Sequence, residues 1–508
     1  MPEDKYIFVT GGVLSGLGKG LISASVSKLL QLRGLELEPV KCDGYLNVDP
    51  GTMNPEEHGE VYVLEDGTEV DMDFGHYERF LDIELSGDRN LTSGKIFKEV
   101  IDKEREGDYL GETVQMIPHV TDHIKQKFET DADITVIEVG GTVGDIENRL
   151  YLEALRQLQG ENTFHIHATL IPYLETTGEQ KTKPTQHSVK ELRSIGLQPD
   201  MIIGRNKEKL EEDIREKISL FTDVEKDSVI SDPNLETEYR IPLIFDEQEV
   251  DEIIAEKIGL PEREKDLEDW KEKVENIEKS AEKKIGVYGK YTGMDDSYAS
   301  IEEALNHASA ELGKKVEVEY VDSENPEDPE KFDGMIIPGG FGQRGIEGKI
   351  EALRKTRENN IPSLGLCLGM QLMVIEFCRN SIGIDATSGE FDQEGRNVVK
   401  KMPGQKDIKQ KGGTMRLGGY EAEVHGKIQE IYGSEAVTER HRHRYEVDPG
   451  IVDNLASKGL KIEGYHRELP EFSRLEDHDF YIGTQAHPEF KSTLENPSPL
   501  FLEFVKSL

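Results

Sequence analysis

The chain has 508 residues, of which 35% are hydrophobic, and this length is sufficient for two or three domains with a core each. It carries 61 basic against 102 acidic residues, and the net charge of −41 argues against nucleic acid and anionic membranes as partners. It has three cysteines and no apolar N-terminal segment or transmembrane-length run, so we expect a protein of the reducing cytoplasm.

The first predicted strand, residues 6–10, runs into a glycine-rich loop, residues 11–20, and then into a helix over residues 21–33. This order is typical of a phosphate-binding loop. Glycines free backbone N–H groups to face the anion, Lys19 reaches the terminal phosphates, and the helix dipole adds to both. The sequence therefore predicts a nucleotide site at the start of the chain.

The loop departs from the usual phosphate-binding pattern at two points. Five residues separate Gly12 from Gly18 where four are usual. Gly20 also stands where a Ser or Thr would bind magnesium. A metal ion bound with the nucleotide must therefore be held by residues elsewhere.

Two carboxylates are candidates for that metal. Glu138 ends an apolar strand over residues 134–137, and a second flexible loop, residues 140–145, follows it. Ligands bind at the carboxyl ends of parallel strands, and hard oxygen donors suit magnesium, so Glu138 is favoured. Asp73 is the second candidate, and a solvated loop acid is the alternative interpretation of that residue.

The rest of this half alternates strands and helices, which predicts a parallel sheet. Strands are expected over residues 164–171 and 200–204, with a helix that runs through Ile195 between them. A loop over residues 181–186 carries two lysines and a threonine beside a proline. This loop is a candidate triphosphate clamp, and a surface charge pair is the alternative.

A charged stretch separates the two halves of the chain. Residues 246–283 read as a terminal helix followed by a linker. We therefore expect a first domain over residues 1–265, a linker over 266–283 and a second domain over 284–508.

The second half contains a cysteine flanked by glycines. Residues 361–366 predict a short buried strand, and Leu368–Phe377 predicts an amphipathic helix, so Cys367 lies on the turn between them. A helix N-terminus lowers a thiol pKa and supplies N–H groups for an oxyanion, which favours a nucleophile. A buried structural cysteine is the alternative, and it is the role we expect for Cys378.

A histidine and a carboxylate near the C-terminus complete the set. His487 follows a predicted strand over residues 480–483, and Glu489 lies two residues further on, where an extended segment would put both side chains on one side. Glu489 would then orient His487, and His487 would deprotonate the thiol. A glycine-rich turn over residues 338–342 can offer a second oxyanion N–H. From Lys284 onwards the chain resembles the triad (class I) glutamine amidotransferases.

Long strings in both halves resemble the CTP synthase family. They are residues 41–80, 138–147 and 181–186 in the first half, and 412–418 and 439–445 in the second. The resemblance implies an α/β fold with two doubly wound domains, an N-terminal P-loop-like (dethiobiotin-synthetase-like) parallel sheet and a C-terminal class I glutaminase domain. It also implies a ligase that aminates UTP to CTP at C4, with ATP as co-substrate and phosphorylated UTP as intermediate.

The same resemblance implies ligands for individual residues. It implies catalytic roles for Cys367, His487, Glu489, Lys19 and Lys41, and Mg²⁺ at Asp73 and Glu138. It implies ATP at Ser15, Gly16, Leu17, Gly18, Lys19, Gly20 and Leu21. It implies UTP or CTP at Ser15, Asp145, Ile146, Glu147, Lys181, Thr182, Lys183, Pro184, Thr185, Gln186 and Lys217. It implies glutamine at Gly340, Leu368, Gly369, Met370, Gln371, Glu390 and Arg444.

The family also passes ammonia between its domains, and His58 matches a position at the exit of that tunnel. Family membership further implies a homotetramer, GTP as an allosteric activator and inhibition by the product CTP. Two stretches depart from the family pattern: residues 148–150, beside the pyrimidine string, and a short segment over 392–402.

Two other interpretations have different sequence requirements. A cobyrinic acid amide synthase-like amidoligase would share the phosphate loop and the triad, but it would lack the strings at residues 47–53 and 181–186. A non-catalytic, nucleotide-regulated assembly protein would be expected to have a broken triad. All three triad residues are present, so the CTP synthase interpretation is favoured.

Overall fold

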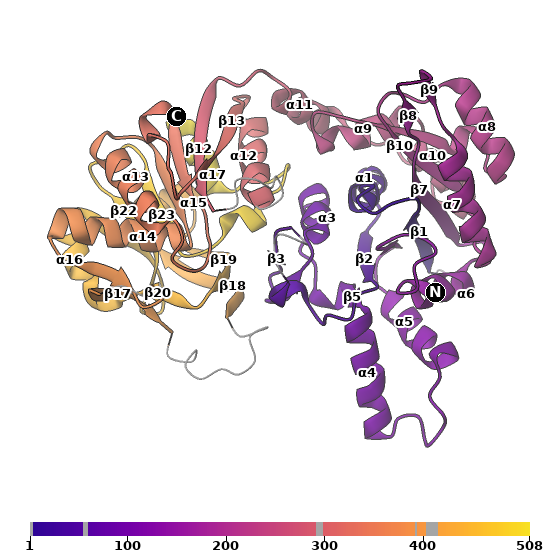
Figure 1. Cartoon of the computed structure of the whole chain (residues 1–508), viewed down its shortest axis with the longest axis horizontal. Coiled ribbons are helices and arrows are strands. Elements are labelled where there is room, and N and C mark those ends of the chain that lie inside the picture. The colour runs from indigo at the N-terminus through magenta and orange to yellow at the C-terminus, as the bar shows by residue number, and fades with distance from the viewer. Residues whose placement is uncertain (1–3, 54–58, 291–297, 392–393, 403–414) are drawn as a thin grey trace. The chain divides into compact units, whose positions relative to one another are not determined.

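The computed structural model describes residues 4–53, 59–290, 298–391, 394–402 and 415–508. They form two compact units (Figure 1). The first consists of Met1–Asp49, His76–Ile83 and Asp88–Lys271, and the second of Pro50–Gly75, Glu84–Gly87 and Glu272–Leu508. The expected linker contains helix α11 (Glu268–Ile277), and the boundary between the units falls inside this helix.

The first unit is built on a seven-stranded sheet in the order β11-β10-β7-β1-β6-β2-β5, with every neighbouring pair parallel. Its strands are β1 (Lys5–Gly11), β2 (Leu37–Asp43), β5 (Asn90–Thr92), β6 (Ile134–Val139), β7 (Thr163–Leu170), β10 (Met201–Asn206) and β11 (Val229–Pro233). Its helices are α1 (Lys19–Leu32), most of α3 (Asp73–Leu81), α4 (Ser93–Glu106), α5 (Thr121–Phe128), α6 (Arg149–Leu158), α7 (Lys183–Ser194), α8 (Glu212–Thr222), α9 (Ile241–Asp246) and α10 (Val250–Ile258). A short hairpin joins β8 (Tyr173–Leu174) to β9 (Glu179–Gln180).

Successive side chains of the central strand β1 point to opposite faces of the sheet, and both faces are covered by helices. Ile7 and Val9 pack into a cluster with apolar residues of α1, α9 and α10. Tyr6 and Phe8 point the other way, into a cluster with α4, α5 and α6. A strand that is buried on both faces is typical of a doubly wound parallel sheet, so the fold predicted for this half is confirmed.

The second unit is built on a nine-stranded sheet in the order β13-β12-β14-β15-β23-β22-β21-β18-β19. Its strands are β12 (Lys283–Gly289), β13 (Val316–Asp322), β14 (Gly334–Ile337), β15 (Ser363–Leu366), β18 (Arg416–Val424), β19 (Ala436–His443), β21 (Leu460–His466), β22 (Leu469–Leu475) and β23 (Tyr481–Thr484). Its helices are α12 (Ala299–Leu312), α13 (Ile346–Glu358), α14 (Leu368–Phe377), α15 (Gly426–Tyr432), α16 (Val452–Ala456) and α17 (Pro499–Ser507). A smaller sheet contains β16 (Ala386–Ser388), β17 (Arg396–Lys401) and β20 (Tyr445–Val447), and β3 (Tyr62–Val63) pairs with β4 (Glu69–Val70).

Only part of the large sheet is parallel. The strands from β13 to β23 are parallel, whereas β22, β21, β18 and β19 continue the sheet in antiparallel fashion. Consecutive strands β21 and β22 are joined by a tight connection at residues 467–468, and such a connection requires antiparallel pairing.

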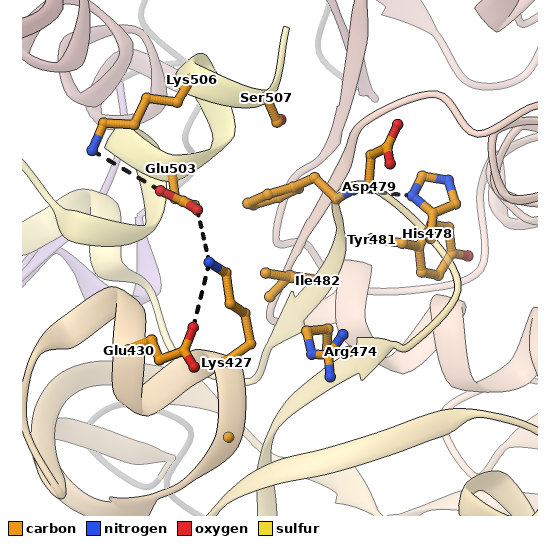
Figure 2. Close-up of a pocket in the computed structure, with 12 residues that line it drawn as sticks. Lys427, Glu430, Arg474, His478, Asp479, Tyr481, Ile482, Glu503, Lys506 and Ser507 are labelled. Atoms are coloured by element: carbon orange, nitrogen blue, oxygen red, sulfur yellow. Dashed lines mark hydrogen bonds and ion pairs between the residues drawn. The ribbon is translucent and has the colours of Figure 1, made fainter.

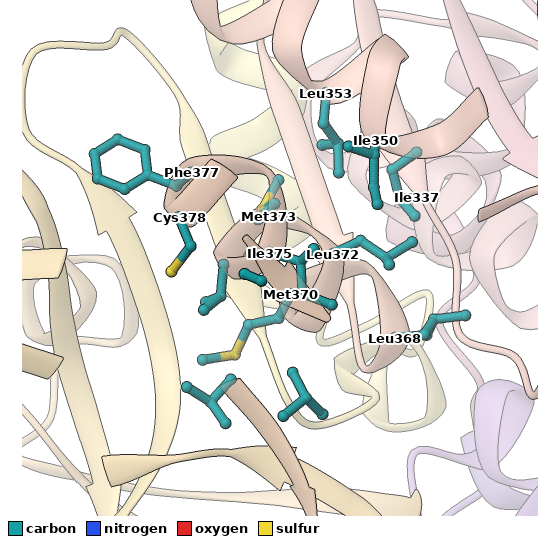
Figure 3. Packing of buried hydrophobic residues seen from close by; sticks show 14 of the residues in the cluster. Ile337, Ile350, Leu353, Leu368, Met370, Leu372, Met373, Ile375, Phe377 and Cys378 are labelled. Carbon is teal, nitrogen blue, oxygen red and sulfur yellow. The ribbon is translucent and has the colours of Figure 1, made fainter. Parts of the chain in front are cut away.

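Helix α14 begins and ends where the sequence predicts, but it is not amphipathic. Every residue from Leu368 to Phe377 is buried, because the helix packs against the sheet on one side and against α13 and the small sheet on others. Figure 3 shows its side chains among those of neighbouring elements, labelled Ile337, Ile350, Leu353, Leu368, Met370, Leu372, Met373, Ile375, Phe377 and Cys378. The helix that follows Cys367 is thus held on all sides by the core.

The hairpin β3–β4 belongs to the second unit although it lies early in the chain. The Tyr62 hydroxyl donates to the Phe490 carbonyl, and Arg440 donates to the Val63 carbonyl at 3.2 Å. Arg442 pairs with Glu69 at 2.9 Å.

Among the described residues, no helix is long and apolar enough to cross a membrane.

Candidate active site

Cys367 occupies a strained turn between β15 and α14. Its backbone has φ 52° and ψ −100°, a conformation that L-residues rarely adopt, and its N–H donates to the Thr484 carbonyl at 2.7 Å. A Cβ on Gly365 would lie 2.7 Å from the Gly369 carbonyl carbon, and one on Gly369 would lie 2.2 Å from the Ile337 oxygen. The two glycines therefore allow the close strand-to-helix approach that places the thiol at the helix N-terminus.

His487 and Glu489 are joined directly, although not through an extended segment. Nδ1 of His487 lies 2.7 Å from Oε1 of Glu489, and Pro488–Lys491 form a turn of 3-10 helix. The expectation of an extended segment was therefore wrong: Pro488, with its fixed φ, starts the turn that brings the two side chains together. Burial acts to lower the pKa of His487, but the charge of Glu489, the charge of Cys367 and hydrogen bonds to both raise it above its ordinary value. This electrostatic arrangement favours an imidazolium beside the cysteine sulfur.

A glutamine that the sequence does not single out also reaches the sulfur. Nε2 of Gln485 donates to Sγ of Cys367 at 3.6 Å, and Oε1 of Gln485 accepts from Gln371 at 3.1 Å. Gln371, from the first turn of α14, also donates to the Tyr445 carbonyl at 2.8 Å. Gln485, two residues before His487, thus orients the thiol. The only sequence signal for this role is that Gln485 directly follows β23.

The glycine-rich turn over residues 338–342 lies against the thiol and the imidazole. A Cβ on Gly339 would lie 2.7 Å from Cε1 of His487 and 3.6 Å from Cβ of Cys367, and one on Gly340 would lie 3.7 Å from Leu368. The second half of the turn is fixed by two side chains. Lys290 donates to the carbonyls of Phe341 and Gly342, and the Gly342 N–H donates to Glu390 at 2.7 Å.

Three of the residues that the resemblance assigns to glutamine meet at this turn, because Gly340 belongs to it, Leu368 lies against it and Glu390 accepts from it. Leu368 to Gln371 are the first four residues of α14. Glu390 is a separate assigned residue, and burial raises the pKa of its carboxyl group. Burial and the charge of Glu390 raise the pKa of Tyr445, whereas the charge of Arg444 lowers it. A carboxylate such as Glu390, which is bonded to the turn, is a chemical match for the amino group of an amino acid.

Two cavities of this unit differ in their chemistry. A cavity of about 130 Å³ lies beside His487 and Glu489 and is lined by the turn at Gly339–Phe341 and by Glu60 and Val61. Another, of about 510 Å³, lies near the start of β23, away from the triad (Figure 2). Three of its charged groups are paired with one another, since Lys427 lies 3.2 Å from Glu503 and 3.7 Å from Glu430. The smaller cavity is therefore the one that belongs to the candidate site.

The predicted phosphate loop of the first unit packs closely against neighbouring segments. Gly18 precedes α1 with φ 78°, and a Cβ on Gly12 would lie 1.5 Å from the Ser188 hydroxyl, so both positions require glycine. Lys19 is the first residue of α1, and its Nζ donates to the Gly141 carbonyl at 2.9 Å. The other residues assigned to ATP are Ser15 and Gly16, which are exposed, and Leu17, Gly20 and Leu21. The loop and the predicted second loop at residues 140–145 thus meet.

Glu138 is the penultimate residue of β6 and is almost fully buried. Its Oε1 accepts from Nζ of Lys41 at 2.9 Å, and its Oε2 accepts from the Tyr77 hydroxyl. The other predicted metal ligand, Asp73, is the first residue of α3, and its N–H donates to Asp71 at 3.2 Å. No group of three or more metal-ligating side chains occurs in the ranges that the structure describes. His58, predicted at the tunnel exit, lies outside the described residues.

The residues assigned to the pyrimidine nucleotide lie on four segments of the first unit: Ser15, Asp145 to Glu147, Lys181 to Gln186 and Lys217. Asp145 accepts from the backbone and side chain of Thr142, at 2.9 and 2.6 Å, and Ile146 is 79% exposed. The predicted loop at residues 181–186 is only partly a loop, because α7 starts at Lys183 with Pro184 in its first turn. Lys181 pairs with Glu179 and lowers the pKa of that carboxyl group. The charge of Lys217 lowers the same pKa, so both lysines lie near one acidic group. The remaining assigned positions are Glu147, Thr182, Thr185 and Gln186, and the last donates to Thr182 at 3.0 Å.

Comparison with known proteins covers nearly the whole chain. The family model described as CTP synthase N-terminus matches residues 5–260, and that described as glutamine amidotransferase class-I matches residues 294–507. A CTP synthase of Caldanaerobacter subterraneus subsp. tengcongensis is 51% identical over 99% of this chain and 98% of its own. CTP synthases of Thermococcus gammatolerans and Methanococcus maripaludis are 50% and 49% identical, over 99% of this chain and 98% and 99% of theirs. The chain therefore belongs to the CTP synthase family of glutamine-hydrolysing ligases.

Proposed function

We propose that Cys367, His487 and Glu489 hydrolyse glutamine to supply the ammonia for CTP formation. The observation that carries this proposal is the 2.7 Å contact between His487 and Glu489 beside a cysteine held in a strained turn at a helix N-terminus. Cys367 attacks the side-chain amide, and His487 gives a proton to the departing ammonia. Water then clears the thioester with His487 as base. The N–H groups of the turn at residues 338–342 and of the start of α14 stabilise the oxyanion.

In the first unit, ATP binds at residues 15–21 and phosphorylates O4 of UTP, and ammonia then displaces phosphate at C4. The position of Lys19 at the start of the helix behind the phosphate loop supports this role. Lys41 supplies a second buried cation, 2.9 Å from Glu138. Asp145 to Glu147, Lys181 to Gln186 and Lys217 hold UTP or the product CTP, since exposed backbone and lysines there suit an anionic nucleotide.

Asp73 and Glu138 would hold Mg²⁺ together with nucleotide phosphates. The donor type fits, because magnesium prefers carboxylate and phosphate oxygens. Both oxygens of Glu138 already accept hydrogen bonds, from Lys41 and Tyr77, so metal binding must replace or share at least one of these contacts. When bound, the ion would neutralise charge on the transferring phosphate.

The 130 Å³ cavity beside the triad is the proposed start of an ammonia path. It continues from His487 to Glu60 and Val61, which follow His58 closely in the sequence. Ammonia is largely protonated in neutral water, so a closed path preserves the nucleophile.

We further propose a homotetramer, activation by GTP, inhibition by CTP and a cytoplasmic location. The location agrees with three buried cysteines that form no disulfide.

The decisive experiment follows CTP formation from UTP and ATP with glutamine and, in parallel, with ammonium chloride. We expect product from both nitrogen sources, with glutamate released only from glutamine. A chain that binds nucleotides but forms no CTP from either source would contradict the proposal and favour an assembly protein. Amidation of a different acid would favour another amidoligase.

A further inference from the structure

A buried chain of amides and imidazoles lies behind the sulfur of Cys367. Its first member is Gln485, whose Nε2 donates to Sγ of Cys367 at 3.6 Å and whose Oε1 accepts from Nε2 of Gln371 at 3.1 Å. Nε2 of Gln371 also donates to the Tyr445 carbonyl at 2.8 Å. That carbonyl has a second donor, because Nδ1 of His443 lies 3.0 Å from it. These contacts join the nucleophile to His443, the last residue of β19.

The Tyr445 carbonyl fixes the orientation of both amides. A carbonyl oxygen can only accept, so Gln371 must turn its NH₂ group toward it. The second N–H of that group then points to Gln485, which must present its oxygen there. Gln485 is left with its NH₂ group toward the sulfur. If either amide alone were reversed, two donors or two acceptors would face each other at a buried position.

His443 holds this carbonyl in place. Its Nδ1 must carry a proton, since the carbonyl only accepts, and its Nε2 lies 3.0 Å from Nδ1 of His441. Burial and the charge of Arg416 lower the pKa of both histidines, which favours neutral rings. In neutral rings Nε2 of His443 accepts from Nδ1 of His441. The ring that donates to Tyr445 therefore cannot turn over without losing both hydrogen bonds.

We propose that His443 is a positioning residue of the glutaminase: through the Tyr445 carbonyl and Gln371, it holds Gln485 with an N–H, and not its oxygen, toward the sulfur of Cys367. The inference rests on the proposed role of Cys367 as nucleophile. A thiolate is stabilised by a hydrogen-bond donor and destabilised by an oxygen lone pair, so this orientation increases the fraction of reactive thiolate. His443 acts only through the chain, because its two ring nitrogens face Tyr445 and His441.

The thiolate can be measured without turnover, from the pH dependence of alkylation of Cys367 by iodoacetamide, with the modified cysteine identified by fragment-ion mass spectrometry. Gln485→Met removes the donor and keeps a side chain of similar volume. We expect the pH midpoint of alkylation to rise and kcat/KM for glutamine to fall about 10- to 100-fold, the usual effect of one hydrogen bond to a charged group. Ammonia-dependent synthesis should be unchanged, and the melting temperature reports the fold.

Two substitutions at His443 separate its hydrogen bond from its bulk. His443→Leu removes the donor to Tyr445, and we expect changes in the same direction but smaller, about 3- to 10-fold in kcat/KM for glutamine. His443→Asn should recover most of that loss, because its side-chain N–H can take the place of Nδ1. His425→Leu, an exposed change just before α15, is the matched control and should keep the wild-type midpoint.

Two results would overturn the inference. One is a wild-type alkylation midpoint in folded Gln485→Met, and the other is a His443→Asn variant as impaired as His443→Leu. The triad proposal would survive either result, because it requires no particular partner for the sulfur besides His487. Glutaminase that survives Cys367→Ala would overturn the triad proposal instead, and the alkylation midpoints would still show whether the chain acts on the thiol.

Discussion

Gly369→Ala is the most informative single change in the second unit. The added Cβ would lie 2.2 Å from the Ile337 oxygen, more than 1 Å inside the ordinary contact distance of 3.4 Å. The obstacle is backbone of β14, which cannot rotate away as a side chain can. Because α14 is enclosed on all sides, the helix start must shift and carry Cys367 with it.

The expected magnitude follows from that shift. Overpacking of a dense core costs about 1–3 kcal/mol, which leaves most domains folded. A displacement of about 1 Å at a reacting group can reduce the rate on the order of 100-fold. We therefore expect kcat/KM for glutamine to fall about 100-fold while the protein stays folded.

The assay compares CTP formation from glutamine and from ammonium chloride, with the melting temperature as a check on folding. Ammonia-dependent synthesis should be unchanged, because it uses no thiol. Gly450→Ala is the control, since its Cβ would meet nothing closer than 3.5 Å. Wild-type glutamine use by a folded Gly369→Ala variant would refute the reasoning from α14.

Four further predictions use the same assays. Cys367→Ala should abolish glutamine-dependent synthesis, by about a thousandfold or more, but keep ammonia-dependent synthesis; a variant that still used glutamine would contradict the two-site mechanism. Glu489→Ala should lose less glutaminase than His487→Ala, since an orienting group matters less than a base, and equal losses would argue against these roles. Lys19→Ala should reduce synthesis from both nitrogen sources and spare basal glutaminase, so undiminished ammonia-dependent synthesis would show that the loop has another function. The melting temperature should rise with salt, because the charge of −41 is poorly screened at about 0.01 M, where the Debye length is about 30 Å. A melting temperature that is highest without salt would count against this effect.

The local sequence predicts helices and strands well where the hydrophobic pattern of a segment matches its burial in the folded chain. β1 and α14 lie where their apolar runs and flanking glycines place them. The amphipathic description of α14 was wrong, because burial on every side depends on elements distant in the sequence. The turn at Pro488–Lys491 was also missed as a helix, although the proline there was a usable signal.

The partners of the site are harder to predict than its central residues. Cys367 and His487 stand out because glycine and proline mark their turns. Gln485 lies 118 residues from Cys367 along the chain. Nothing local distinguishes this residue from the many other polar ones, because its role arises only when β23 pairs with β15, the strand before Cys367.

The hairpin β3–β4 limits how this chain can be recombined with a relative. A chimaera that exchanges only residues 284–508 would set Phe490, Arg440 and Arg442 from one parent against Tyr62, Val63 and Glu69 from the other. The unit of inheritance for the glutaminase is therefore discontinuous, and an exchange that preserves it must transfer residues 60–70 together with the C-terminal segment.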